Sequence, residues 1–260
     1  MIKKDILLLE KQFKSQPHLA IILGSGQKGL NHLLSNIIEV EFDDLYSLPK
    51  PTIKGHPGKL VFGTLGNKNI LIIYGRFHLY EGYSIKEVSI LVDIVKSLGT
   101  KLLLVTNSSG CMVSSWELES YMLMTDYIDF TNYKKEIRTI NKDTAFNKYF
   151  NNIILDICNQ IKLKIYKGTY SWVLGPTYET KAEIQYMKQK GGHVVGMSTV
   201  PEIIRANELC LPVIGLSYLT NYSVGIIDNP LTHQEVINKA SSAHIILSKI
   251  IKKLVSLIHD

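Results

Sequence analysis

Short apolar runs alternate along this chain with longer segments in which an apolar residue recurs every three or four positions. Short runs of β-branched and aliphatic residues bounded by glycine, proline or asparagine are typical of strands, and the longer spacing is typical of amphipathic helices. We expect strands over Leu19–Leu23, Lys59–Thr64, Ile70–Tyr74, Leu102–Thr106, Tyr121–Met124, Thr169–Leu174, His193–Gly196 and Val213–Leu219. We expect helices over Lys3–Ser15, Ile85–Leu98, Lys148–Lys162, Lys181–Lys190, Pro201–Glu208 and His233–Ile258.

This alternation predicts an α/β fold with a central β-sheet flanked by helices. The 260 residues are enough for one large core, so we expect a single domain over residues 1–260. Gly66 and Asn67 separate two apolar runs and favour a hairpin between Lys59 and Tyr74. A hairpin pairs its strands antiparallel, so the sheet should be mixed.

Composition argues against several classes of protein. The chain has no run of eighteen apolar residues and begins with a charged amphipathic segment, so we expect a cytoplasmic protein with no membrane partner. The chain has three cysteines, and they lack the spacing of a metal-binding motif, so we expect no disulfide and no metal site. The net charge of +6 could suit a nucleic acid, but the lysines are scattered and no binding motif accompanies them, so we expect no nucleic-acid partner.

Arginine is rare against this lysine-rich background. Arg76 is one of three arginines and lies beside His78 in a glycine-bounded segment. The guanidinium group binds phosphate through two parallel hydrogen bonds, which lysine cannot do. Ser25 lies between two glycines after a predicted strand, and we expect a helix to follow it, which is a typical anion-binding turn. The Ser25 turn alone, or His78 alone, could have a purely structural role. Together with Arg76 they favour a phosphate site.

A carboxylate, a hydroxyl and a carboxamide follow or close three predicted strands: Glu179, Ser198 and Asn221. Small molecules bind at the carboxyl ends of strands in open α/β sheets, so we expect these side chains to converge on one ligand. Glu179 alone could instead stabilise the first turn of the helix that follows it.

Six blocks, taken in chain order, resemble the trimeric, low-molecular-weight purine nucleoside phosphorylases over nearly the whole chain. The blocks are Gly24–Gly26, Gly55–Gly58, Gly75–Gly82, Thr106–Gly110, Gly175–Thr180 with Gly196–Glu202, and Leu219–Asn221 with Leu231–Glu235. The resemblance implies the nucleoside phosphorylase fold, a homotrimer, and inorganic phosphate as co-substrate with no other cofactor. It implies phosphorolysis of a purine nucleoside to the free base and (deoxy)ribose 1-phosphate, a reaction of purine salvage.

The same resemblance assigns roles to individual residues, with Asn221, Glu179 and His78 as the catalytic ones. The phosphate ligands it implies are Ser25, Arg76, His78, Ser108 and Ser198, with His56 on a mobile loop. The purine contacts it implies are Tyr178, Glu179 and Asn221, and the ribose contacts are Tyr80, Met197 and His233.

Hydrogen-bonding chemistry then indicates the class of base. Asn221 can donate to purine N7 and interact at O6, and Glu179 can accept from N1–H of a 6-oxopurine. Adenine presents a lone pair at N1 and an amine at position 6, so the same pair disfavours it. Relatives that use 6-aminopurines carry an aspartate where Asn221 stands and lack the glutamate. The expected substrates are therefore inosine, guanosine and xanthosine or their deoxy forms.

The chain departs from the family pattern over Asp129–Asn151, which is shorter and lacks the aromatic residue that covers a neighbouring subunit's sugar. We expect Phe146 to take that place. Two alternatives stay open: a phosphorylase of methylthioadenosine, which Glu179 and Asn221 disfavour, and a catalytically weakened purine-binding paralogue.

Overall fold

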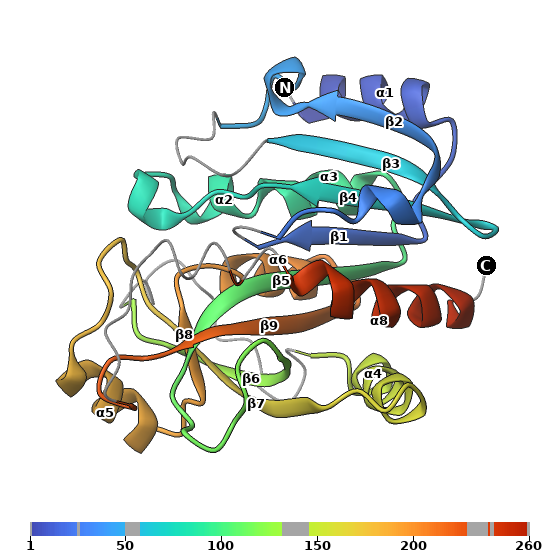
Figure 1. Cartoon of the computed structure of the whole chain (residues 1–260). Helices are drawn as coiled ribbons and strands as arrows, with labels where there is room; N and C mark the ends of the chain where they lie inside the picture. Colours follow the sequence, from blue (N-terminus) through green and yellow to red (C-terminus); the bar gives the residue numbers. More distant parts are fainter. Residues whose placement is uncertain are drawn as a thin grey trace.

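The computed structural model describes residues 2–24, 27–49, 58–131, 146–227, 239 and 242–258, and its centre is a mixed β-sheet (Figure 1). Its strands are β1 (Leu19–Leu23), β2 (Ser35–Glu41), β3 (Lys59–Leu65), β4 (Lys68–Tyr74), β5 (Leu102–Cys111), β6 (Tyr121–Asp129), β7 (Ile165–Trp172), β8 (Val194–Gly196) and β9 (Val213–Tyr222). Its α-helices are α1 (Ile2–Phe13), α2 (Ile85–Val88), α3 (Ile90–Ser97), α4 (Lys148–Gln160), α5 (Lys181–Gln189), α6 (Val200–Glu208) and α8 (Ala243–Leu257). Short 3-10 turns cover Asn31–Leu33, Phe42–Asp44 and Leu79–Glu81.

The strands follow the order β2-β3-β4-β1-β5-β8-β7-β6-β9, and β9 pairs again with β5. Strands β5, β8, β7, β6 and β9 therefore close a ring, while β1 to β4 extend the sheet from β5. The pairings of β1 with β5 and of β5 with β9 are parallel, so their carboxyl ends lie at one edge. That edge is where a small-molecule site is expected in such sheets.

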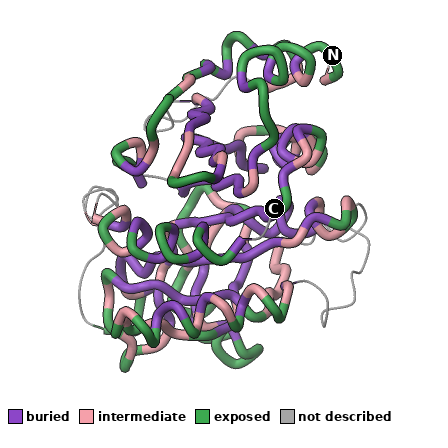
Figure 2. Tube along the Cα trace, turned by 90° about the vertical axis from the view of Figure 1, so that its right-hand side faces the viewer, coloured by how far each residue is buried: buried purple, intermediate pink, exposed green. Residues whose placement is uncertain are grey.

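Two apolar layers hold helices against opposite faces of this sheet. Alternate residues of β1 point to opposite sides, with Ala20 and Ile22 in one core cluster and Ile21 in the other. The first cluster includes residues of α1, α3 and α6, and the second includes residues of α4 and α8. Buried positions run along the strands while the outer helix faces are exposed (Figure 2). The sheet is thus buried on both sides, which explains why its strands are continuous apolar runs.

The structure confirms the α/β class, the mixed sheet flanked by helices and the hairpin. Strands β3 and β4 pair antiparallel from Lys59 opposite Tyr74 to Leu65 opposite Lys68. All eight predicted strands are present, β1 with its predicted ends and the other seven with shifted ends. The predicted helices are present over the described residues, except that the start of the last one, His233–Ile258, lies outside them.

Three local predictions were wrong. Strand β2 was not predicted, because its exposed edge position leaves only Ile38 and Val40 as a weak apolar alternation. The predicted helix Ile85–Leu98 breaks at Ser89, whose hydroxyl donates to the Ile85 carbonyl at 2.8 Å and competes with the helical pattern. No helix follows the turn after β1 directly: the chain makes one 3-10 turn and then enters β2.

Candidate functional site

A pocket of about 140 Å³ lies at the edge where β5 and β9 end. This is close to the volume of a cavity that holds a benzene ring, so the pocket can accept a planar ring rather than a single water. Its walls come from the segment after β4, from β5 and β9, from the β7–α5 connection and from the β8–α6 junction. The lining residues are His78, Tyr80, Asn107, Ser108, Ser109, Gly110, Tyr178, Glu179, Val195, Gly196, Met197, Ser198, Thr220, Asn221, Ser223 and Val224.

A β-bulge in β9 turns Asn221 into this pocket. Ser109 pairs with Leu219, but the next residue of β5, Gly110, pairs with Asn221, so Thr220 has no opposite residue. Neighbouring strand residues normally face opposite sides, yet Thr220 and Asn221 both line the pocket. The extra residue changes the direction of the side chains, as bulges near active sites commonly do.

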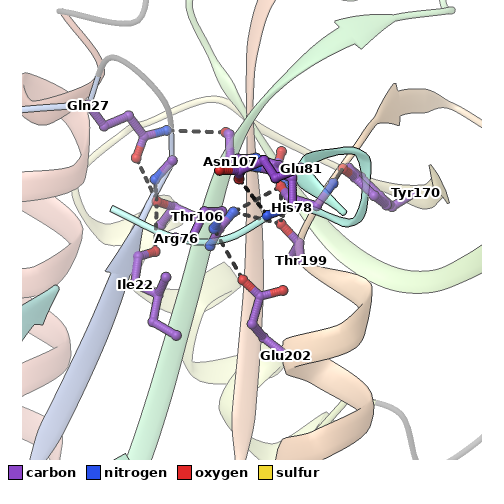
Figure 3. A network of polar contacts seen from close by, with 12 residues as sticks. Ile22, Gln27, Arg76, His78, Glu81, Thr106, Asn107, Tyr170, Thr199 and Glu202 are labelled. Atoms are coloured by element: carbon purple, nitrogen blue, oxygen red, sulfur yellow. Dashed lines mark hydrogen bonds and ion pairs between the residues drawn. The ribbon is translucent and has the colours of Figure 1, made fainter. Parts of the chain in front are cut away.

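Arg76 is buried beside the pocket, with 1% of its surface exposed, and it is held by groups at the start of α6 (Figure 3). Its Nη1 donates to Ser198 Oγ and to Thr199 Oγ1, both at 3.0 Å. Its Nε lies 3.1 Å from Glu202 Oε1, an ion pair whose atoms are not aligned as a hydrogen bond. Its Nη2 has no hydrogen-bond partner among the described residues. The guanidinium is therefore fixed in position and still has donor capacity.

The hydrogen bonds around Thr199 determine what Ser198 can do in the pocket. Thr199 Oγ1 accepts from Arg76 and, at 2.9 Å, from Asn107 Nδ2, so its own hydrogen points to Ser198 Oγ at 3.1 Å. Ser198 Oγ then accepts from both Arg76 and Thr199, and a hydroxyl has only two acceptor lone pairs. The Ser198 hydrogen is left to donate, and the neighbouring Tyr170 hydroxyl competes for it with an acceptor in the pocket. An acceptor, and above all an anion, fits that position.

Thr199 has φ of 76° and ψ of −42°, a strained conformation for a β-branched residue. Such a backbone outlier costs about 1–3 kcal/mol and persists only where surrounding contacts compensate for it. The hydrogen bonds to Arg76, Asn107 and Ser198 provide these contacts. The strain thus places the Ser198 and Thr199 hydroxyls side by side at the amino end of α6.

Strands β1 and β5 are tied together at the same edge. Gln27 Nε2 donates to the Asn107 carbonyl at 3.1 Å, and Thr106 Oγ1 donates to Gln27 Oε1 at 2.6 Å. A Cβ on Gly24 would lie 2.5 Å from Asn107 Cα, so only glycine allows this approach. Gly24 and Gln27 are therefore held close to the lining residues Asn107 and Ser108.

His78 is oriented by a carboxylate and an aromatic ring. Glu81 Oε1 lies 3.1 Å from His78 Nδ1 and accepts the His78 backbone N–H at 2.8 Å. Because an ionised carboxylate only accepts, Nδ1 carries hydrogen in this contact. The Tyr80 ring stacks on His78 with centroids 4.8 Å apart, and burial raises the pKa of Tyr80 to about 12. Tyr80 thus stays a neutral hydroxyl at the pocket.

Glu179 and Tyr178, from the β7–α5 connection, line the same pocket as Asn221. Burial raises the pKa of the Glu179 carboxyl, since desolvation disfavours its charge, and Glu183 adds a smaller effect in the same direction. The Tyr178 side chain is 45% exposed and lies open at the pocket rim. A partly desolvated carboxylate is a stronger hydrogen-bond acceptor than an exposed one.

The sequence analysis placed site residues on separate segments, and the structure brings nine of them to one place. Eight line the pocket: His78, Tyr80, Ser108, Tyr178, Glu179, Met197, Ser198 and Asn221. Arg76 does not line it and reaches it through Ser198. Ser25, His56 and His233 lie outside the described residues, so their roles stay predictions.

The expectation for Phe146 was wrong. Its side chain is 5% exposed and packs in the main core beside Gly215, whose Cβ position would lie 3.1 Å from the ring. A side chain buried in the core of its own subunit is not available to cover the sugar of a neighbour.

Sequence reasoning missed the residues that support the site. Thr199, Glu202 and Asn107 lie inside the recognised blocks but were given no individual role. Thr199 contacts Arg76 and Asn107, and each contact joins residues more than ninety positions apart in the sequence. No local pattern reveals such contacts. Ser223, which follows the last strand, was also missed, and its polar character next to Asn221 was the available signal.

The described part of the chain holds no group of three or more His, Cys, Asp or Glu side chains that could bind a metal ion. None of its described helices is both long and apolar enough to cross a membrane. All three cysteines are free, with Cys111 and Cys158 buried and Cys210 exposed.

Comparisons with known proteins agree with this geometry. The family model of the phosphorylase superfamily matches residues 18–256. Purine nucleoside phosphorylase 1 of Bacillus subtilis is 33% identical over 98% of this chain and 97% of its own length. The rat purine nucleoside phosphorylase is 33% identical over 90% of this chain and 87% of its own. A crystal structure of Schistosoma mansoni purine nucleoside phosphorylase with adenosine superposes with a TM-score of 0.90 at 27% identity, covering 100% of this chain and 97% of that one.

The fold and the strand-end pocket therefore define a member of the phosphorylase superfamily. Within it, the chain belongs to the purine nucleoside phosphorylase family, whose members are pentosyltransferases.

We expect Glu202→Gln to destabilise the fold by about 3 kcal/mol, because it leaves the buried Arg76 charge without its counter-ion. Glu208→Gln is the matched control: it lies on the same helix and pairs with Arg205 at the surface, so its loss should stay below about 1 kcal/mol. Urea denaturation of the two variants measures both values. Equal midpoints would show that Glu202 does not compensate the Arg76 charge.

Proposed function

We propose that this chain catalyses the phosphorolysis of 6-oxopurine (deoxy)ribonucleosides, inosine and guanosine above all, in purine salvage. The products are the free base and (deoxy)ribose 1-phosphate, and inorganic phosphate is the co-substrate with no other cofactor. One observation carries the proposal: the Ser198 hydroxyl, anchored by the buried Arg76, lines a pocket that Glu179 and Asn221 also line. A hydroxyl that can bind an anion and a carboxylate and an amide that can bind the edge of a purine therefore line the same pocket.

The reaction breaks the bond between the ribose anomeric carbon and purine N9 while phosphate adds to the opposite side. Positive charge builds on the sugar and negative charge on the departing base. Groups that interact more strongly with these charges than with the ground state lower the barrier. An enzyme for this reaction needs an anion site and a base site of different character, and the two walls of the pocket match these requirements.

On the phosphate side, a hydroxyl and a histidine line the pocket, and the buried Arg76 contacts the hydroxyl. Ser198 and His78 are the lining residues, His78 with its Nδ1 engaged by Glu81, and Arg76 Nη2 has no partner among the described residues. The backbone around Ser108, at the end of β5, lies on the same wall. Ser25 and His56 complete this phosphate site in our proposal.

On the base side, Glu179 accepts from N1–H and Asn221 donates at N7, where negative charge collects as the base leaves. Asn221 is 9% exposed, so a mismatched edge would leave buried polar groups unpaired. That penalty is the physical basis for preferring 6-oxopurines over adenine. Tyr178 forms the aromatic wall against the base.

Tyr80, Met197 and His233 are the proposed ribose contacts, and the first two lie on the pocket wall. We further propose that the chain acts in the cytoplasm as a homotrimer, as the family resemblance implies. The Schistosoma mansoni enzyme has been crystallised with adenosine and with inosine, at TM-scores of 0.90 and 0.89 to this chain, which supports a nucleoside as the ligand of this fold.

Inosine should be cleaved only when phosphate is present. A coupled assay that oxidises the released hypoxanthine measures this cleavage. Guanosine, adenosine and methylthioadenosine tested in parallel identify the class of base. Cleavage of methylthioadenosine in preference to inosine would favour the 6-aminopurine alternative. Tight purine binding without turnover would identify a weakened paralogue.

Within that assay, Arg76→Lys should raise the KM for phosphate roughly 5- to 100-fold, because one ammonium group cannot replace several fixed donors. Arg205→Lys is the control, since Arg205 pairs with Asp93 away from the pocket and should leave this KM unchanged. An unaltered phosphate KM in Arg76→Lys would exclude Arg76 from the phosphate site.

Binding of hypoxanthine should weaken as the pH falls through the raised pKa of Glu179, because protonation removes the charged acceptor for N1–H. The raised value places this loss above the pH at which an exposed glutamate titrates, about 4.3. Calorimetry across this range measures the effect.

Glu179→Gln should bind hypoxanthine weakly and without that pH dependence. Glu183→Gln is the matched control: it should keep the pH dependence and move it slightly to lower pH, because the Glu183 charge adds a small raising effect on the pKa of Glu179, while hydrogen bonds from Thr180 lower the pKa of Glu183 itself. A wild-type pH profile that persists in Glu179→Gln would assign the titration to another group.

A further inference from the structure

The hydrogens of the Asn221 amide are partly used inside the protein. Its Nδ2 donates to the Tyr222 carbonyl at 3.1 Å, and its Oδ1 accepts from Thr220 Oγ1 at 2.8 Å. An amide nitrogen carries two hydrogens, so one remains for the ligand. A 6-oxopurine presents two acceptors on that edge, N7 and O6. One N–H cannot make two well-directed hydrogen bonds at once, so the edge needs a second donor.

Ser223 is placed to provide that donor. It lines the pocket, it is 5% exposed, and its Oγ has no hydrogen-bond partner among the described residues. A Cβ on Gly110 would lie 2.6 Å from Ser223 Oγ and 3.4 Å from Asn221 Nδ2. The two polar groups therefore converge beside Gly110, where the absence of a side chain makes room for the Ser223 hydroxyl.

The backbone holds Ser223 in this place. Its N–H donates to the Cys111 carbonyl at 2.8 Å, and its carbonyl accepts from the Ile226 N–H at 3.1 Å. The same Cβ position on Gly110 would lie 3.3 Å from Val195 Cγ1, so an apolar wall borders the site. A buried hydroxyl that lacks a partner is unfavourable unless a ligand supplies one.

We propose that Ser223 is a specificity-determining residue whose hydroxyl donates to O6 of the bound purine while Asn221 donates to N7. The inference rests on the proposed function, since it divides the recognition of the same 6-oxopurine between two side chains. The oxygen at position 6 is an acceptor only, so it matches a hydroxyl hydrogen that the protein leaves unused. A purine without an oxygen at position 6 cannot accept this hydrogen bond from Ser223.

The test compares inosine with purine riboside, which keeps N7 but has hydrogen at position 6. Ser223→Ala should lower kcat/KM for inosine about tenfold, because a buried acceptor loses its donor, and should change the value for purine riboside less than roughly twofold. Binding of the free bases hypoxanthine and purine, measured by calorimetry, should show the same difference. Undiminished activity on purine riboside also verifies that the variant is folded.

Ser171→Ala is the matched control. Ser171 is also a fully buried serine whose hydroxyl has no hydrogen-bond partner among the described residues, but it lies on β7 outside the pocket. Its variant should leave the ratio of inosine to purine riboside at the wild-type value.

Two results would overturn the inference. An equal loss on both nucleosides would remove Ser223 from position 6, and no loss on either would remove it from the base altogether. Wild-type turnover of inosine with phosphate would stand in both cases, so these results are distinct from a failure of the proposed function. Wild-type protein that neither binds hypoxanthine nor cleaves inosine would overturn both proposals together.

Discussion

The site depends on the burial of one charge, the Arg76 guanidinium. An ion taken out of water is costly unless counter-charge and hydrogen bonds surround it, and both come from the first turns of α6 through Glu202, Ser198 and Thr199. The same contacts compensate for the strained backbone of Thr199. Stability and anion recognition are therefore coupled, since Ser198, which helps to hold the arginine, also lines the pocket.

The closed ring of strands provides the rigid frame for this arrangement. Strand β5 pairs with β1, β8 and β9, so segments that follow four different strands meet at one edge. Helix α6 starts directly after β8, which places Ser198 beside the end of β5. The bulge at Thr220 turns Asn221 into the pocket, and the absence of a side chain on Gly110 makes room for Ser223 beside it. Small changes of register therefore decide which side chains a bound ring meets.

Much of the fold followed from local patterns because its strands are buried on both faces. Strand β1 matches its predicted range, Leu19–Leu23, since a wholly apolar run bounded by polar residues leaves little choice. Edge strand β2 escaped prediction because partial exposure weakens the apolar signal. Strand β5 runs on through Asn107 and Ser108, beyond its predicted end at Thr106, because these two residues pair with β9. Nonlocal pairing overrode local propensity at these positions.

The sequence by itself determined which chemical groups are available and that they follow strands: the guanidinium of Arg76, the carboxylate of Glu179 and the amide of Asn221. It did not determine the directions of their hydrogens. Only the tertiary structure decided that Ser198 accepts from Arg76, that Asn221 has one N–H left, and that Ser223 has an unused hydroxyl. It also buried Phe146 in the core. Hydrogen-bond capacity is shared among residues far apart in the chain, so no local pattern can assign it.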